Sequence, residues 1–263
     1  MFCFGIRSVF TVDDGRCPPA TNSEVEQLGQ FLIEAKWFLK QLQSLDRSKG
    51  AGSDGLSLAL ANYIYQPITM IYQYSIDTGL IPNDWKRAHV IAIHKKDSRS
   101  DPLNYRPISM TCIASKILEH FICHDMNKFL ETHHLLSDCQ HGFSNKHGCD
   151  TQLLSTTLDL IDSYDLNIFV ELAVLDFPKA FDVLSHAKLN IKLGSIGIHE
   201  STCRWISERL SCRTLLVIVN SAKSSLHKLT SGVPQGSVLG PLFFWYTFND
   251  MPSLWMAILH INR

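Results

Sequence analysis

The segment that most constrains the fold is a short apolar run, IFVELAVL at residues 168–175, which only Glu171 interrupts. The run leads directly into Asp176, and Asp182 follows six positions later. A continuous apolar run of this length predicts a strand buried inside the protein. A carboxylate at the end of such a strand is costly unless a positive group faces it. The run therefore predicts a buried strand and raises the question of what faces Asp176.

The composition is that of an ordinary globular protein. The chain has 263 residues, 45% apolar and 19% charged, which allows a substantial core in one large domain or two modest ones. The formal net charge of −1 neither indicates nor excludes a polyanionic partner, because local clustering of charge matters more than the sum. The eight cysteines lack the spacing of a disulfide framework, which favours a reduced, intracellular chain.

Neither end of the sequence predicts a membrane-associated segment. The first residues are apolar, but Arg7 interrupts them and no basic region precedes an apolar block, so we expect no signal peptide. The most hydrophobic stretch, 241–261, is split by Asn249, Asp250 and Pro252. A membrane span requires about 20 uninterrupted apolar residues, so a buried helix followed by a strand is expected there instead.

The periodicity of the apolar residues predicts a mixture of helices and strands. Helices are expected at 22–44, 56–77, 113–130 and 151–163, with a mixed helical segment at 186–210. Strands are expected at 89–96, 214–220 and 224–230, the last two as a hairpin. Loops are expected at 48–55, 97–107 and 231–242, the last of which enters an apolar helix. Because helices and strands do not alternate regularly, the predicted class is α+β.

The residues after the apolar run suggest two interpretations. Mg²⁺ takes hard oxygen ligands and commonly bridges carboxylates to substrate phosphates, so Asp176 is a candidate metal ligand. Lys179 would then lie near incoming phosphates, and the ring of Phe181 would lie under a sugar. The alternative is structural: Asp176 ends a strand and Asp182 caps the next helix.

Four sequence blocks, taken together, resemble the reverse transcriptase domain of non-LTR (LINE-like) retrotransposons, most closely the jockey and CR1 types. The blocks are NYRPISM (104–110), QHGF (140–143), LDFPKAFD (175–182) and SGVPQGSVLGPL (231–242). The resemblance runs in order from about Val25 to Asp250, and the stretches 79–97, 116–120 and 197–213 fit it too.

This resemblance implies a right-hand polymerase fold with fingers and a partial palm, the thumb being absent. Residues 1–21 would be a poorly defined N-terminal extension, and 22–263 a partial reverse transcriptase domain. Within it, 22–165 would be mainly fingers with preceding helices, and 166–263 a partial palm. The implied partners are an RNA template, a DNA primer and dNTPs, without a membrane and with no implied oligomeric state.

The resemblance also implies roles for individual residues. Asp176 would be the catalytic, first metal-binding aspartate of the palm, with the Phe177 carbonyl as a further ligand of Mg²⁺. Phe181 would exclude a 2′-hydroxyl, and its alternative role is that of a core phenylalanine. The implied nucleotide-binding residues are Lys95, Lys96, Arg106, Lys179, Ala180, Phe181, Gln235 and Gly236.

The 231–242 block and the basic segment each have a physical rationale and an alternative. Gln235 carries an amide that can donate and accept at once, and Gly232 and Gly236 permit close backbone approach; the alternative is an ordinary loop that enters a helix. Between 84 and 106 there are six Lys or Arg against three Asp or Glu, which suits phosphate contact or a solvated loop. Arg106 is favoured because a guanidinium can bind two phosphate oxygens.

A rival site is a zinc centre. Cys139, His141, His147 and Cys149 are chemically adequate zinc ligands. Their spacing is not a usual finger pattern, and they lie around the QHGF block, so zinc is the less favoured interpretation.

One departure from the family bears on activity. Two-metal polymerisation needs further carboxylates, which the family supplies from a later hairpin with two adjacent aspartates. Asn249 and Asp250 match the end of the helix before that hairpin, and no Asp-Asp pair follows Asp176. We therefore expect no DNA synthesis by this chain alone. The alternatives are a non-catalytic nucleic-acid-binding remnant of a mobile element, or a fragment without a role; Phe181 disfavours an RNA-dependent RNA polymerase.

Overall fold

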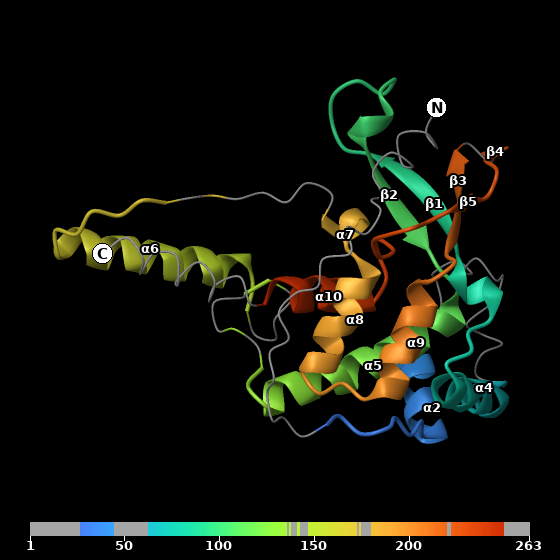
Figure 1. Ribbon diagram of the computed structural model, residues 1–263. Helices are drawn as coiled ribbons and strands as arrows, with labels where there is room; N and C mark the ends of the chain where they lie inside the picture. The colour runs from blue at the N-terminus through green and yellow to red at the C-terminus, as the bar shows by residue number, and fades with distance from the viewer. Residues whose placement is uncertain are drawn as a thin grey trace.

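A computed structural model describes residues 27–44, 63–135, 137, 141–142, 147–172, 174, 180–219 and 222–249. Its helices in these ranges are α2 (Ala35–Ser44), α4 (Tyr65–Thr78), α5 (Ile113–Thr132), α6 (Cys149–Asp165), α7 (Ala180–Val183), α8 (His186–Ser195), α9 (Glu200–Leu210) and α10 (Leu239–Phe248), with 3-10 turns η1 (Asn83–Lys86) and η2 (Pro102–Asn104) (Figure 1). Its strands are β1 (Arg87–His94), β2 (Tyr105–Met110), β3 (Thr214–Val219), β4 (Ala222–Lys223) and β5 (His227–Lys228).

The strands form one mixed sheet in the order β2-β1-β3-β4, with β5 also paired to β3. β1 pairs with β2 antiparallel and with β3 parallel, whereas β4 and β5 pair with β3 antiparallel. Alternate residues of a strand point to opposite faces, and one face carries the small buried cluster Ala88, Val90, Leu215 and Val217. Helices and a mixed sheet in one chain confirm the mixed α/β character expected from the sequence.

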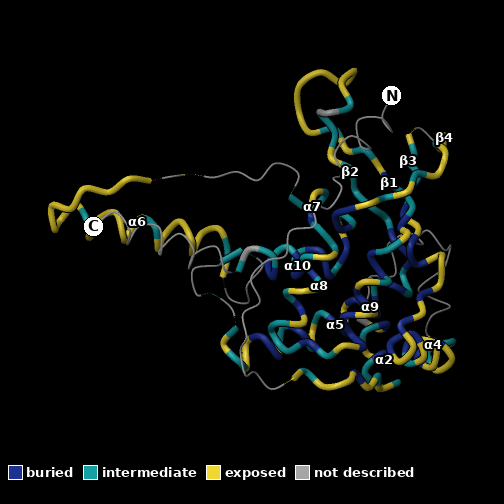
Figure 2. Tube along the Cα trace, in the orientation of Figure 1, coloured by how far each residue is buried: buried dark blue, intermediate teal, exposed yellow. Residues whose placement is uncertain are grey.

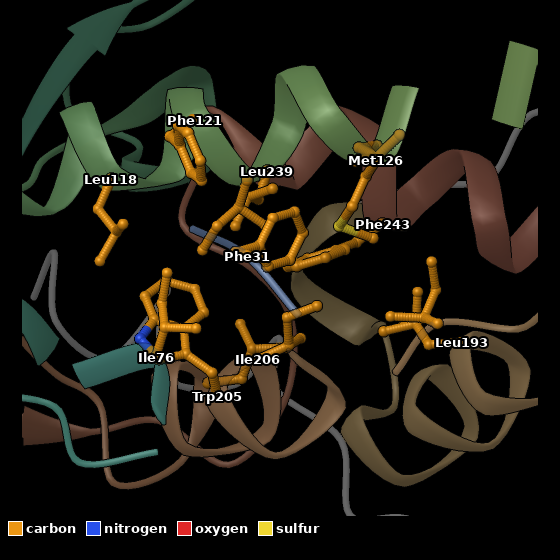
Figure 3. Packing of buried hydrophobic residues seen from close by; sticks show 14 of the residues in the cluster. Phe31, Ile76, Leu118, Phe121, Met126, Leu193, Trp205, Ile206, Leu239 and Phe243 are labelled. Carbon is orange, nitrogen blue, oxygen red and sulfur yellow. The ribbon is translucent and has the colours of Figure 1, made fainter. Parts of the chain in front are cut away.

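The main core lies among the helices. Leu118, Phe121 and Met126 of α5 face Trp205 and Ile206 of α9 across this core (Figure 3). The apolar residues that are buried on α5 follow the three-to-four-residue spacing that predicted the helix: Ile117, Leu118, Phe121, Ile122, Met126, Phe129 and Leu130. The helix extends over Ile113–Thr132.

The last helix is buried on most sides because other helices surround it. Five of its large apolar side chains are buried: Leu239, Leu242, Phe243, Trp245 and Tyr246. α10 lies against α5, α7 and α8 (Figure 1). The helix predicted after the 231–242 block is therefore confirmed, and the strand predicted beyond it lies outside the described residues. Among the described helices, none combines the length and apolar character needed to cross a bilayer.

The prediction of one helix over 22–44 is wrong for its described first half. Residues 27–34 are not helical, and helix α2 begins only at Ala35. Leu28 instead forms a bridge with Ile198, and its N–H donates to the Gly197 carbonyl at 2.9 Å. The side chain of Gln73 satisfies the neighbouring backbone, since it bonds the Ile33 N–H at 2.9 Å and the Phe31 carbonyl at 3.1 Å. Tertiary contacts thus replace the hydrogen bonds that a helix would have made.

The loop predicted at 97–107 is also shorter than expected. Tyr105, Arg106 and Pro107 belong to β2, where Pro107 lies opposite Ala92 of β1. β2 is an edge strand of the described sheet, a position that tolerates a residue without an N–H donor.

The buried strand predicted at 168–175 is contradicted by its described part. Residues 168–172 and 174 are not in a strand, and Phe169 and Val174 expose 86% and 85% of their surface. A strand needs a neighbouring strand for its N–H and C=O groups, and none of the described strands pairs with this segment. Leu175 lies outside the described residues.

Helix α6 is formed as predicted but is not covered. The helix begins after Gly148, whose N–H donates to Thr151 Oγ1 at 2.9 Å, and none of its residues is buried. Figures 1 and 2 show α6 and the segment after it extending away from the other helices, mostly in the exposed colour. Residues 143–146 before this helix, and residues 173 and 175–179 after it, lie outside the described ranges.

Candidate functional site

The loop at residues 231–238, between the sheet and α10, lies directly against α7 and the turn that follows it. The Val233 N–H donates to the Phe181 carbonyl at 2.7 Å, and the Gly232 N–H donates to the Leu184 carbonyl at 2.8 Å. These backbone bonds join the two sequence blocks, 175–182 and 231–242, that carry most of the predicted site residues.

Glycine is required at position 232 for two reasons. Its φ of +72° lies in the left-handed region, and a Cβ there would lie 2.5 Å from the Asp182 carbonyl oxygen. The hydroxyl of the preceding residue, Ser231, donates to that same carbonyl at 2.8 Å. The loop therefore approaches α7 as closely as backbone atoms allow.

The carboxylate of Asp182 binds the side-chain amide of Gln235. Gln235 Nε2 donates to Asp182 Oδ1 and Oδ2, both at 3.1 Å. The structural alternative was that Asp182 caps the next helix, and this is wrong. The N-cap of α8 is Ser185, whose hydroxyl accepts from the Lys188 N–H at 3.2 Å. Asp182 instead connects α7 to the loop.

The same loop is tied to the sheet. The Ser109 N–H of β2 donates to the Gln235 carbonyl at 2.9 Å, and Gly236 follows with a φ of +94°. A cavity of about 30 Å³ adjoins this contact and is lined in part by Ser109, Asp182, Arg213 and Gln235. It is large enough for a water molecule but not for a nucleobase.

Arg213 supports the loop from inside the protein. Its side chain is 2% exposed and donates to the carbonyls of Leu210 at 3.1 Å, of Ser231 at 2.7 Å and of Gly232. Burial, followed by repulsion from Arg209, lowers the pKa of Arg213 to about 9, so the guanidinium is still charged at neutral pH. A buried cation thus holds the carbonyl groups at the start of the loop.

A second buried arginine anchors the other end of the loop through Glu119. Arg209 donates to Glu119 Oε1 from Nε at 3.0 Å and from Nη2 at 2.7 Å. Glu119 Oε2 accepts the Val238 N–H at 3.1 Å, at the residue that precedes α10. Both charged side chains are almost fully buried, so the pair fixes the end of the loop and the start of the helix together.

The side chain of Phe181 is partly buried. Its ring lies 5.3 Å from that of Phe244, centroid to centroid, and it packs partly against the main core. Ala180 is the first residue of α7, beside it. Phe181 is thus fixed by α10, which is compatible with either role considered for it.

The predicted basic residues lie on the β1–β2 hairpin. Lys95 and Lys96 are exposed and directly follow β1, and the Lys95 N–H donates to the Asn104 carbonyl at 2.8 Å. The connection between β1 and β2 extends away from the helices (Figure 1). Arg106 is exposed in β2, opposite Ile93. A backbone hydrogen bond at Ser109, three residues after Arg106, links this hairpin to the 231–238 loop.

The predicted metal ligands lie outside the described residues. This applies to Asp176 and Phe177, and also to Lys179. Within the described ranges, no group of three or more His, Cys, Asp or Glu side chains could hold a metal ion. Asp182, the first described carboxylate after Asp176, already accepts the Gln235 amide.

The described part of the zinc candidate does not form a ligand set. The rings of His141 and His147 lie 4.6 Å apart, and His141 Nδ1 contacts the Thr151 hydroxyl at 2.8 Å. Cys139 lies outside the described residues, and Cys149 is exposed at the start of α6.

Sequence reasoning missed the buried groups that hold the loop. Glu119 is a charged residue on the apolar stripe of α5, and this position alone was a signal that it needed a partner. Arg209 and Arg213 lie in the 197–213 stretch, which was recognised only as part of the resemblance.

Comparison with known proteins identifies the class. A family model described as reverse transcriptase (RNA-dependent DNA polymerase) matches residues 93–262. The chain belongs to this family, and its relatives are the RNA-directed DNA polymerases of non-LTR retrotransposons, as the resemblance implied.

Three relatives from Drosophila melanogaster illustrate the similarity. The probable RNA-directed DNA polymerase from transposon BS is 27% identical over 84% of this chain and 25% of its own length. The probable polymerase from the X-element transposon is 30% identical over 71% of this chain and 20% of its own length. The RNA-directed DNA polymerase from mobile element jockey is 30% identical over 74% and 21%. The chain therefore spans about a quarter or less of the relatives it matches.

Proposed function

We propose that this chain forms the fingers and part of the palm of a retrotransposon reverse transcriptase and binds an RNA template, a DNA primer and a dNTP. Residues 22–165 would be mainly fingers and residues from 166 on would be palm. The observation that supports this most is the 231–238 loop, which backbone bonds and the Asp182–Gln235 pair hold against α7, beside β2.

The chemistry of the exposed residues fits this proposal. Lys95, Lys96 and Arg106 would attract phosphates through charge, and the guanidinium of Arg106 can bind two phosphate oxygens. Phe181 would limit space beside the sugar, with Ala180 next to it and Lys179 near the triphosphate. Gln235 and Gly236 would contact the nucleotide or the templating strand from the loop.

The proposed resident metal is Mg²⁺, held by Asp176 and the Phe177 carbonyl. A bound metal pair would stabilise the attacking and leaving oxygens of the transfer reaction. Because one aspartate supplies few oxygen ligands and no Asp-Asp pair follows it, we infer that the 263-residue chain alone does not extend a primer. Primer extension on an RNA template with dNTPs and Mg²⁺ tests this inference, and synthesis that Asp176→Ala abolishes would contradict it.

Binding to an RNA/DNA hybrid tests the proposed function directly. Fluorescence anisotropy at several salt concentrations should give an affinity that falls steeply as salt rises, because phosphate contacts release counterions. The triple variant Lys95→Ala, Lys96→Ala and Arg106→Ala should lower the salt slope by up to about 3, since each phosphate contact contributes about 0.9.

A matched control removes the same charge elsewhere. Lys36 and Lys40 of α2 and Lys128 of α5 are exposed. Helix α2 lies among the helices, away from the β1–β2 hairpin (Figure 1). Their triple alanine variant should retain the wild-type salt slope. Binding that does not respond to salt, or equal losses in both variants, would contradict the proposal.

A second candidate function is a non-catalytic nucleic-acid-binding remnant of a mobile element. The exposed basic hairpin favours it, because charge on an accessible hairpin is sufficient for binding without catalysis. Both candidate functions predict that this chain binds the hybrid but does not extend a primer. A dNTP that raises the affinity for the hybrid would favour the first candidate, since a simple remnant has no nucleotide site.

A further inference from the structure

We propose that Asp182 is a positioning residue that fixes the orientation of the Gln235 side-chain amide, so that this amide presents its carbonyl oxygen to the bound ligand. The inference rests on the proposed function insofar as the ligand is a nucleotide or nucleic acid. The orientation of the Gln235 amide rests only on contacts within the protein, so it can be tested without a nucleotide or nucleic acid.

The geometry of the pair determines which end of the amide faces Asp182. Gln235 Nε2 lies 3.1 Å from each of the two carboxylate oxygens of Asp182. An ionised carboxylate can only accept hydrogen bonds, so the nitrogen of the amide, and not its oxygen, has to face it. The carbonyl oxygen is therefore held on the side of the amide away from Asp182.

Both partners of the pair are themselves anchored. The Asp182 backbone carbonyl accepts the Ser231 hydroxyl at 2.8 Å, which brings the start of the loop to α7. The backbone of Gln235 is held by the Ser109 N–H of β2 at 2.9 Å. Because the pair spans 53 residues of sequence and is partly buried, the side-chain contact completes a fixed arrangement of three segments.

Charge favours the same orientation. Asp182 is among the groups that raise the pKa of the buried Arg213, so the two opposite charges attract each other. This attraction acts together with the two hydrogen bonds that Gln235 Nε2 donates to the carboxylate.

This orientation has a consequence for recognition. A fixed carbonyl oxygen accepts a hydrogen bond from a hydroxyl or amino group of a ligand, and it repels a phosphate oxygen. An amide that could turn over would also present its NH₂ group, which donates a hydrogen bond to a phosphate oxygen. Asp182 would therefore make Gln235 selective for hydrogen-bond donors without touching the ligand.

A double-mutant cycle on hybrid affinity tests the role of Asp182. Asp182→Asn is nearly isosteric but removes the charge and one acceptor, so it should weaken hybrid binding about fivefold, as expected for one hydrogen bond. In the Gln235→Ala background the same change should have almost no effect, because Asp182 acts through the amide. An equal loss in both backgrounds would overturn the proposal and make Asp182 a purely structural residue.

The matched control is Ser231→Ala, which removes another side-chain bond between the loop and α7 but does not touch the amide. Ser231→Ala should change the hybrid affinity by the same factor in the wild-type and Gln235→Ala backgrounds. Unchanged far-UV circular dichroism and thermal unfolding would show that Asp182→Asn remains folded.

A measurement without nucleic acid separates this inference from the proposed function. The side-chain NH₂ signals of Gln235 in a nitrogen-proton correlation spectrum are those that disappear in Gln235→Ala. In Asp182→Asn these signals should shift, because the nitrogen has lost a charged acceptor. If wild-type protein does not bind the hybrid but these signals shift, the proposed function fails and the positioning holds. If the signals do not shift, the positioning fails whatever the protein binds.

Discussion

The helical core and the α6 segment contain similar residues but have opposite surroundings. In the core, apolar side chains of α5, α9 and α10 contact one another and are buried (Figures 2 and 3). In α6 and the residues after it, apolar side chains of comparable size are exposed, among them Leu153, Leu154, Leu158 and Phe169. Burial in this protein therefore follows from which segments meet, because the apolar content alone does not distinguish the two regions.

Cysteine reactivity should show the largest difference between the two regions. Burial raises the pKa of Cys123 and of Cys203 to about 11, whereas Cys149, at the start of α6, is exposed. At pH 8 a thiol with a pKa of about 11 is ionised in about one molecule in a thousand, and the thiolate is the reactive form. Timed alkylation followed by peptide mass spectrometry should find Cys123 and Cys203 labelled far more slowly than Cys149. Equal rates would mean that the core opens readily.

Breaking the buried ion pair should cause the largest loss of stability. Glu119→Ala leaves the Arg209 charge buried without its partner and removes the acceptor of the Val238 N–H. We expect the free energy of unfolding in urea to fall by about 3–5 kcal/mol. The exposed pair Asp84–Arg87, with atoms 3.7 Å apart, provides the control, since Asp84→Ala should cost less than about 1 kcal/mol. Similar losses of unfolding free energy in both variants would contradict a stabilising role for the buried Glu119–Arg209 pair.

A cavity in the core should be the next largest effect. Leu118 of α5 is 0% exposed, so Leu118→Ala should lower the free energy of unfolding by about 3 kcal/mol, through lost burial and the cavity that remains. The measurement is the midpoint and slope of urea unfolding. A loss below about 1 kcal/mol would show that the packing around α5 is loose.

Replacing Gly232 should have a smaller but local effect. Gly232→Ala places a Cβ 2.5 Å from the Asp182 carbonyl oxygen at a φ of +72°, which should cost about 1–3 kcal/mol of stability. Gly194 of α8 is the matched control, because apart from its chain neighbours and the backbone of its own helix no atom lies within 4 Å of its added Cβ. Gly194→Ala should instead stabilise the helix by about 0.5–1 kcal/mol. Thermal unfolding of both variants would show whether the two changes have opposite signs.

The sequence predicted those elements whose formation depends mainly on local periodicity. α5 and α6 were expected within a few residues of their ends, because each has apolar residues at helical spacing. The strands β1 and β3 were expected from short β-branched runs, and the family was recognised from four blocks of sequence.

The errors concern interactions between distant segments. The run 168–174 has the composition of a buried strand, but a strand also requires a neighbour, and periodicity contains no information about that. Residues 27–34 have helical spacing, yet Gln73 and Gly197 provide other partners for their backbone. Likewise, the contact between Glu119 and Arg209 joins residues 90 positions apart, so neither local pattern indicated it.

Truncating an exposed side chain of α6 should have the smallest effect on stability. It tests whether α6, unlike the helical core, is exposed in solution. Leu158 is 51% exposed, so Leu158→Ala removes little buried surface and should change the free energy of unfolding by less than about 0.5 kcal/mol. The reason is that truncation costs stability only where it removes contacts or leaves a cavity, and this side chain has few contacts to lose. Urea unfolding beside Leu118→Ala measures the difference directly, with the same chemical change at a buried and an exposed leucine. A loss of about 2 kcal/mol or more at Leu158 would mean that the apolar face of α6 is covered in solution, and the contrast between the two regions would then disappear.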